Sequence, residues 1–320
     1  MAILLTGGAG FIGSCLLKQL NENGITDIYV VDNVGTSEKW KNLVGKQYKS
    51  YIHKTDLPSL LNQLSDISCI IHLGACSSTT EDNFDYLWEN NVNFSKILFN
   101  HAAFKKIPFI YASSAATYGN DSNGFSDKCD IRTLEPMNRY GYSKQLFDTW
   151  QISQNHRPPQ VVGLKFFNVY GPNEYHKDKM ASMIYRGFWE VKGSGKIRLF
   201  KSNVEGLGDG EQCRDFVYVK DVCRVILWFM KNPEISGIYN VGCGKSCSFN
   251  DLARALFSAM NLPLEIEYID MPGQLTRQYQ SYTVADISSL RNVGCDVDFK
   301  RLSSGVSEYV RQYLEPQKHY

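Results

Sequence analysis

The first 33 residues constrain the fold more than any other stretch, because they read as strand, glycine turn, helix and strand. The apolar run Ala2–Leu5 leads directly into glycines at positions 7, 10 and 13. Apolar residues then recur at helical spacing from Phe11 to Leu20. A second apolar run follows and ends at Asp32. This order predicts one βαβ unit at the start of a parallel sheet.

Each glycine of the turn has a mechanical reason. Gly7 allows a tight turn off the strand, Gly10 leaves backbone N–H groups open to a pyrophosphate, and Gly13 lets the helix pack closely on the sheet. The phosphates would then lie at the helix N-terminus, where the dipole favours anions. Asp32 ends the second strand where a carboxylate would accept hydrogen bonds from an adenosine ribose. We therefore expect dinucleotide binding; the plainer alternative is a tight turn that binds nothing.

Composition narrows the classes of protein that fit. With 320 residues the chain can bury a large core, and its formal net charge is only +1. Its basic residues form no tail, so we expect neither nucleic acid nor a membrane surface as a partner. The apolar run Val225–Met230 is too short to span a bilayer. No signal peptide precedes the first strand, so we expect a cytoplasmic protein.

The cysteines argue against disulfides and metals. The chain has nine of them, an odd number, and they are scattered without paired CxxC motifs. Cys243 and Cys247 form the one close pair, which we expect to lie in a loop. Reduced thiols and no metal site are the prediction.

Further along, the chain alternates apolar runs with helical patterns. The apolar run Cys69–Leu73 opens into small residues, which would let a ligand lie against the backbone at the end of a strand. We expect His72, inside that run, to be structural. Asn90 and Asn91 follow on a predicted helix, where they would fasten loop backbone or cofactor.

The remaining elements complete an α/β pattern. We predict strands at Pro108–Ala112, Val161–Phe166, Gly237–Val241 and Leu264–Ile269, a return to the sheet at Asp215–Asp221, and helices at Asn138–Trp150, Val222–Met230, Phe249–Met260 and Arg301–Leu314.

Tyr140 and Lys144 are the leading candidates for catalysis. They lie four residues apart at the start of a predicted helix, so both occupy one face. The lysine cation and an oxidised nicotinamide would favour the phenolate and lower the pKa of Tyr140 toward neutrality. Tyr140 could then remove a hydroxyl proton while hydride leaves the same carbon. Ser114, at the end of the preceding strand, would hydrogen-bond the same oxygen. Alternatively, the pair is an ordinary feature of a helix surface.

Several motifs together resemble the extended short-chain dehydrogenase/reductase superfamily, whose members oxidise and modify nucleotide sugars. They are TGGAGFIG, a strand ending in VVDN, SSAATYG and YGYSK. Within it, GACSSTTE from Gly74 and NVYGPNEYHKDKMAS from Asn168 resemble the ADP-L-glycero-D-manno-heptose 6-epimerase family. The resemblance implies a doubly wound, mostly parallel Rossmann sheet with a smaller C-terminal α/β lobe. It divides the chain into a cofactor domain (1–167 with about 212–245) and a substrate lobe (168–211 with 246–320).

The implied activity is epimerisation of ADP-heptose at C6″, which supplies heptose for the lipopolysaccharide core. Such a carbon bears no acidic hydrogen, so inversion needs hydride removal, a ketone and hydride return to the other face. One acid/base group on each side of the carbonyl suits that route. The resemblance assigns the second to Lys177, which otherwise reads as a solvated loop cation.

The resemblance also implies binding residues. The glycine turn and the resemblance together give the cofactor set Gly7, Gly10, Phe11, Ile12, Gly13, Asp32, Asn33, Lys39, Lys54, Leu73, Gly74, Ala75, Cys76, Ser77, Asn90, Lys144, Val169 and Lys177. The substrate set is Ser78, Asn168, Lys179, Arg186, Phe200, Lys201, Ser202, Asn203, Arg214 and Tyr279. Arg214 would hold the diphosphate through its planar fork, or else pair with Asp215 or Asp221.

Some positions depart from the family pattern. Lys179 stands where a small Ser is usual, Arg186 stands where a His is usual, and 201–212 is longer and richer in glycine. Asp32 alone favours NAD, since a carboxylate repels a 2′-phosphate. Lys39 and Lys54 match positions that hold that phosphate, so the prediction is one tightly bound NADP per subunit. The family also implies a homo-oligomer, such as a pentamer.

Three other functions share part of this pattern. A 4,6-dehydratase would need an Asp-Glu pair near Ala115 and Ala116, and none is there. A UDP-hexose 4-epimerase shares the Tyr, Lys and Ser and is the main enzymatic alternative. A non-catalytic dinucleotide-binding sensor would not need Tyr140, Lys144 and Lys177 together.

Overall fold

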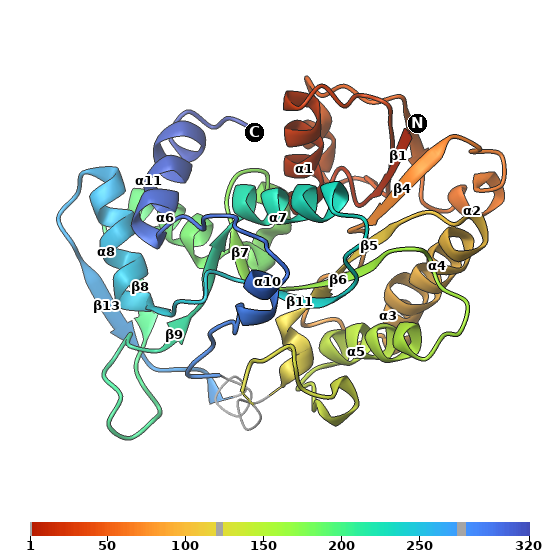
Figure 1. Cartoon of the computed structure of the whole chain (residues 1–320). Helices are drawn as coiled ribbons and strands as arrows, with labels where there is room; N and C mark the ends of the chain where they lie inside the picture. Colours follow the sequence, from red (N-terminus) through yellow and green to blue (C-terminus); the bar gives the residue numbers. More distant parts are fainter. Residues whose placement is uncertain (1, 120–123, 274–279) are drawn as a thin grey trace.

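A seven-stranded parallel sheet forms the centre of the computed structural model, which describes residues 2–119, 124–273 and 280–320 (Figure 1). Its strand order is β11-β6-β5-β4-β1-β2-β3, and every neighbouring pair is parallel. The strands are β1 (Ala2–Thr6), β2 (Ile28–Asp32), β3 (Ser50–His53), β4 (Ile67–His72), β5 (Phe109–Ser114), β6 (Val161–Phe166) and β11 (Gly237–Val241). The chain builds outward from β1 in both directions, so the predicted doubly wound fold is confirmed.

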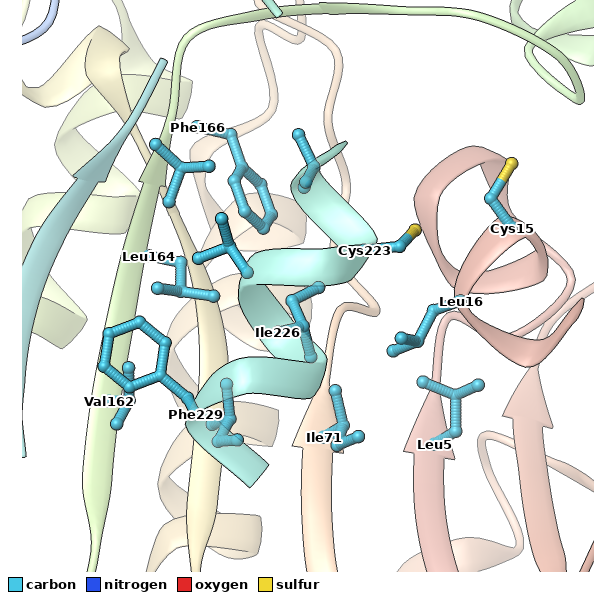
Figure 2. Packing of buried hydrophobic residues seen from close by; sticks show 14 of the residues in the cluster. Leu5, Cys15, Leu16, Ile71, Val162, Leu164, Phe166, Cys223, Ile226 and Phe229 are labelled. Carbon is cyan, nitrogen blue, oxygen red and sulfur yellow. The ribbon is translucent and has the colours of Figure 1, made fainter. Parts of the chain in front are cut away.

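Helices cover both faces of this sheet because its strands are apolar on both faces. Ile3 and Leu5 belong to a core cluster with α1 and α7, whereas Leu4 belongs to a cluster with α2, α4 and α5. Figure 2 shows the first cluster, in which Ile226 and Phe229 of α7 face the strands that carry Leu164 and Ile71. These helices are α1 (Phe11–Glu22), α2 (Leu57–Leu60), α4 (Phe94–Lys105), α5 (Arg139–Ile152) and α7 (Val219–Lys231).

A second lobe has its own core. Its buried residues include Phe188, Leu256 and Tyr309, and they pack three helices against a parallel strand pair. The elements are α6 (Met183–Ser194), β8 (Ile197–Phe200), α8 (Phe249–Met260), β13 (Ile266–Ile269) and α11 (Leu302–Tyr309). The predicted helix at Arg301–Leu314 is confirmed as α11 followed by a π-helical turn, Val310–Leu314.

The remaining elements are short. They are α3 (Phe84–Leu87), a π-helical segment (Trp88–Asn93), β7 (Asn168–Tyr170), β9 (Cys213–Arg214), β10 (Phe216–Tyr218), β12 (Cys247–Ser248), α10 (Ser288–Asn292) and 3-10 helices at Glu38–Leu43, Ala115–Tyr118, Ile131–Thr133 and Tyr175–Met180.

Three expectations need correction. The segment Asp215–Asp221 does not return to the main sheet, because β10 pairs with β7 in a separate two-stranded sheet and α7 begins at Val219. Strand β3 is absent from the predicted strands, because only Ile52 in it is buried and its apolar signal is weak. Cys247 lies in β12, which pairs with β9, and not in a loop.

The structure also bears on the expectations about disulfides, membrane-spanning segments and metal sites. All nine cysteines carry free thiols. Within the described ranges, no helix is long and apolar enough to cross a membrane, and no three His, Cys, Asp or Glu side chains group as they would around a metal.

Gly13 generates a prediction about stability. A Cβ there would lie 2.1 Å from the carbonyl oxygen of Gly7, so backbone must move to admit it. We expect Gly13→Ala to lower the free energy of unfolding by about 1–3 kcal/mol, as overpacking does. Chemical denaturation measures the change.

Gly193 in α6 provides the matched control, because a Cβ added there would meet no atom within 4 Å. Gly193→Ala should be neutral or stabilise by up to about 1 kcal/mol, since alanine favours helix. Equal destabilisation by both substitutions would contradict the role given to Gly13.

Candidate active site

The glycine turn forms as the sequence predicts. Gly7 adopts a positive φ of 70°, its N–H donates to the carbonyl of Val31 at 2.7 Å, and Gly10 N–H donates back to Gly7 at 3.0 Å. The helix α1 then begins at Phe11. Its first N–H groups therefore face the carboxyl ends of the strands, where an anion would be stabilised. This cradle fits a dinucleotide phosphate.

Asp32 binds the backbone of the glycine turn and forms an ion pair with a lysine. One carboxylate oxygen accepts from Ala9 N–H at 2.8 Å, and the other forms an ion pair with Lys39 Nζ at 2.8 Å. Asp32, Lys39 and Lys54 line a small cavity of about 120 Å³. The Lys54 ammonium donates to the Asn90 side chain. Two lysines therefore lie at the adenosine end of the site.

A larger cavity of about 630 Å³ brings the predicted catalytic groups together. Ser114 at the end of β5, Tyr140 and Lys144 of α5, and Lys177 from the 3-10 helix Tyr175–Met180 all line it, beside the glycine turn. Every residue of the predicted cofactor set lines this cavity or the smaller one. Four catalytic candidates from three segments thus share one space.

A close approach of backbone lets Tyr140 reach Ser114. Gly141 has no side chain, and a Cβ there would lie 2.5 Å from the carbonyl oxygen of Ala116. The Asn138 side chain caps α5 by accepting from Gly141 N–H at 2.8 Å. As a result Tyr140 and Ser114 share a side-chain hydrogen bond.

The fall expected in the pKa of Tyr140 depends partly on a bound, oxidised nicotinamide, and in the protein by itself the pKa is raised instead. Burial raises the pKa of the phenol, and the hydrogen bond with Ser114 only partly opposes that rise. Burial also lowers the pKa of Lys144 to about 8, although Asp148 acts against it. The Lys144 ammonium donates to the carbonyl of Ala112 at 3.0 Å. Desolvation, which sequence spacing does not reveal, is the largest cause of both shifts.

A buried carboxylate, Glu174, holds the segment that carries Lys177. Glu174 accepts from the N–H of Gly171 at 3.2 Å and from the N–H and hydroxyl of Ser182 at 2.5 and 2.7 Å, so it ties together both ends of the segment. Loss of solvent lowers the pKa of Lys177, and Glu174 partly restores it. The ammonium lies 5.5 Å from the ring centroid of Phe11 at the glycine turn.

The predicted substrate residues divide into three groups. Ser78 and Asn168 line the larger cavity. Lys179, Arg186, Lys201 and Asn203 are exposed, Phe200, Ser202 and Arg214 are partly exposed, and none of these seven lines it. Arg214 donates to the carbonyl of Cys213 at 2.8 Å and lies over Phe249. Tyr279 lies outside the described residues.

Residues not predicted from sequence also line the larger cavity. They are Ser37, Thr79, Ala112, Ser113, Phe166, Phe167, His176 and Met180. Most are immediate neighbours of predicted residues, so extending each motif by one position along its strand end or loop would have found them.

The predicted structural role of His72 is confirmed. Ser95 donates to the carbonyl of Asn91 at 2.7 Å, so it accepts from His72 Nε2 at 2.8 Å, and Nδ1 accepts from the Thr6 hydroxyl at 2.6 Å. Burial lowers the pKa of His72 to about 3. The ring is therefore neutral and fully bonded.

Asn91 fastens loop backbone, as predicted. It accepts from Cys76 N–H at 2.8 Å and donates to the Cys76 carbonyl at 3.0 Å and to the Ser143 hydroxyl at 2.9 Å. One amide thereby joins the loop after β4 to helix α5.

Comparison with known proteins gives a consistent result. The chain matches the NAD dependent epimerase/dehydratase family over residues 3–242. It is 50% identical over 315 residues to the ADP-L-glycero-D-manno-heptose-6-epimerase of Nitratidesulfovibrio vulgaris, covering 97% of each chain. It is 45% identical over 330 residues to the protein of the same name from Fusobacterium nucleatum, covering 99% of each.

A solved structure is also similar. The crystal structure of the Helicobacter pylori ADP-L-glycero-D-manno-heptose-6-epimerase superposes with a TM-score of 0.82 at 32% identity. The match covers 97% of this chain and 95% of that one.

The three hydrogen bonds of Asn91 generate a prediction. Asn91→Ala leaves the part-buried N–H and carbonyl of Cys76 without this partner, while the Ser143 hydroxyl still donates to the carbonyl of Tyr140, so we expect the free energy of unfolding to fall by about 1–3 kcal/mol. Asn93→Ala is the control, because that side chain only donates to Glu89 at the surface. Urea titration compares the two, and an equal loss in both would argue against the bridging role.

Proposed function

The chain belongs to the NAD dependent epimerase/dehydratase family, and we propose that it interconverts ADP-D-glycero-D-manno-heptose and ADP-L-glycero-D-manno-heptose by transient oxidation at C6″. The observation that carries this proposal is that Tyr140, Ser114, Lys144 and Lys177 line one cavity together with the glycine turn. Near-full-length relatives bearing the epimerase name support the choice of substrate. The enzyme is then an isomerase.

Tyr140 is the first acid/base group in this proposal. Its oxygen would remove the proton from the C6″ hydroxyl, and Ser114 would hydrogen-bond the same substrate oxygen. Lys144, one helical turn further on, would favour the phenolate by its charge. A nicotinamide dinucleotide supplies hydride acceptance and return when it is bound. The protein's own task is to place the substrate oxygen between the phenol and the serine.

Lys177 is the second acid/base group. It comes from a different segment than Tyr140, so it can serve the opposite side of the ketone when the configuration is inverted. Its lowered pKa, caused by loss of solvent, suits an amine that must exchange a proton near neutral pH. Glu174 limits that fall and keeps the segment in place.

The nucleotide sugar would lie between the sheet and the second lobe. In this proposal Ser78 and Asn168 contact the heptose within the cavity. The ADP moiety would take the outer residues Lys179, Arg186, Phe200, Lys201, Ser202, Asn203, Arg214 and Tyr279. Residues 1–167 with about 212–245 would serve the cofactor, and 168–211 with 246–320 the substrate.

The cofactor in this proposal is NADP. Lys39 already forms an ion pair with Asp32, so the carboxylate that would repel a 2′-phosphate is neutralised within the site. Lys54 supplies a second cation beside the same small cavity. We further propose a cytoplasmic homo-oligomer that supplies heptose for lipopolysaccharide, as the family resemblance implies.

The direct test of the function is incubation of the purified protein with ADP-heptose and, separately, with UDP-galactose. NMR of the products should show inversion at C6″ of the heptose and no change in UDP-galactose. Turnover of UDP-galactose alone would favour a UDP-hexose 4-epimerase, and no turnover of either would favour a sensor.

Deuterium at C6″ tests the chemical route. Hydride transfer to and from a bound cofactor keeps the label on the sugar, because carbon-bound hydride does not exchange with water. Mass spectrometry of the product measures it. Loss of deuterium to solvent during turnover would rule this route out.

The role of Tyr140 predicts a separation of chemistry from cofactor binding. Tyr140→Phe should lower kcat by about 100-fold or more, as loss of a general acid/base does. The cofactor should stay bound. Tyr142→Phe is the control, since Tyr142 is exposed and stacks on Phe84. Full activity of Tyr140→Phe would refute the assignment.

The two lysines at the adenosine end predict cofactor preference. Lys39→Ala leaves Asp32 without its cation, so affinity for NADP relative to NAD should fall about tenfold or more. Lys41→Ala, which removes an exposed cation paired with Glu38, should have no effect. Mass spectrometry of the cofactor released on denaturation measures the ratio, and unchanged preference would count against NADP recognition here.

A further inference from the structure

A buried ion pair lies beneath the proton-handling groups of the site. We propose that Asp148 and Lys165 are positioning residues, which hold Ser114 against the helix that carries Tyr140 and Lys144 and govern how those two groups hold protons. This inference rests on the proposed function. It adds two residues that neither touch the cavity nor belong to any motif identified in the sequence.

The pair is almost completely removed from solvent. Lys165 Nζ in β6 lies 3.7 Å from Asp148 Oδ2 in α5, and their side chains are 1% and 0% exposed. The ammonium also donates to the Thr117 hydroxyl at 2.6 Å and lies 4.5 Å from the ring centroid of Tyr118. Burying an ammonium and a carboxylate is costly, because both lose their hydration. Hydrogen bonds replace part of that hydration: Asp148 also accepts from the hydroxyls of Tyr111 and Ser113, at 2.8 and 2.6 Å.

The ion pair is hydrogen-bonded to the chain on both sides of Ser114. On one side, Asp148 accepts from the Ser113 hydroxyl at 2.6 Å. On the other, the Thr117 hydroxyl bound by Lys165 donates to the carbonyl of Ser114 at 2.8 Å. The end of β5 is thereby fixed relative to α5, and the oxygen of Ser114 is held where the phenol can reach it.

The same helix face carries Tyr140, Lys144 and Asp148 at intervals of four residues. Asp148 therefore lies one turn below Lys144, whose ammonium is already fixed to the carbonyl of Ala112. A carboxylate at that position favours the charged form of the lysine and disfavours the charged form of the phenol.

The other titratable groups around Lys144 do not cancel this effect. Cys76, from the loop after β4, acts in the same direction as Asp148, less strongly than Asp148 on Lys144 and more strongly on Tyr140. His72 of β4 is neutral, because burial and Lys144 itself lower its pKa to about 3. Asp148 raises the pKa of both Lys144 and Tyr140, so loss of its charge lowers both.

The test removes the charge with little change of shape. Asp148→Asn should move both limbs of the pH profile of kcat to lower pH, by about one pH unit, and leave the cofactor bound. If the unpaired Lys165 prevents folding, Asp148→Asn combined with Lys165→Met removes both charges and should give the same shift. Lys165→Arg, which keeps the charge, should retain the parent profile.

A second readout needs no turnover and therefore separates this inference from the proposed function. Ultraviolet titration of the phenolate, with Tyr140→Phe as the blank, should show Tyr140 ionising at lower pH in the Asp148 variants. Glu308→Gln is the control, because its partly buried pair with Lys220, at 2.7 Å, lies away from the site. Phenolate and rate profiles that stay where the parent's lie, in a folded and cofactor-loaded variant, overturn the inference.

Discussion

The parallel arrangement of the central strands is the constraint on which the site depends. Because every neighbouring pair in the seven-stranded sheet is parallel, all carboxyl ends lie at one edge. The glycine turn after β1, the small residues after β4 and Ser114 at the end of β5 therefore meet there. Antiparallel pairing at a single position would send one of these groups to the opposite edge. The hydrophobic faces that hold α1 and α7 on one side and α4 and α5 on the other thus also hold the chemistry together.

Burial decides what the assembled groups can do. Tyr140 and Lys144 are both nearly inaccessible, so each is pushed toward its neutral form, and the pair by itself does not produce a phenolate at neutral pH. Charges placed behind them, such as Asp148, then matter more than they would in water. The same holds for Lys177, which relies on the buried Glu174 for its position and part of its charge. In both cases a carboxylate that is itself hydrogen-bonded by neighbouring residues supports a lysine at the cavity wall.

Much of the architecture follows from local pattern. Strands β6 and β11 and helix α8 have the bounds that apolar periodicity predicts, because each is long, regular and buried. The pattern fails where an element is short or lacks two buried positions, as in β3, or where it joins a neighbour other than the main sheet, as in β10. Pairing partners of short strands are set by which neighbour is nearby in space, and this information is absent from a window of a few residues.

The sequence by itself determined the dinucleotide cradle, the doubly wound sheet and the place of Tyr140 and Lys144 on one helix, because each depends on residues close together in the chain. Only the tertiary structure decided that Lys177 lies against Phe11, that Lys39 neutralises Asp32, and that Asp148 of that helix meets Lys165. It also decided the direction in which the pKa of Tyr140 moves. Desolvation and contacts between distant segments depend on how the whole chain packs, and no local spacing encodes them.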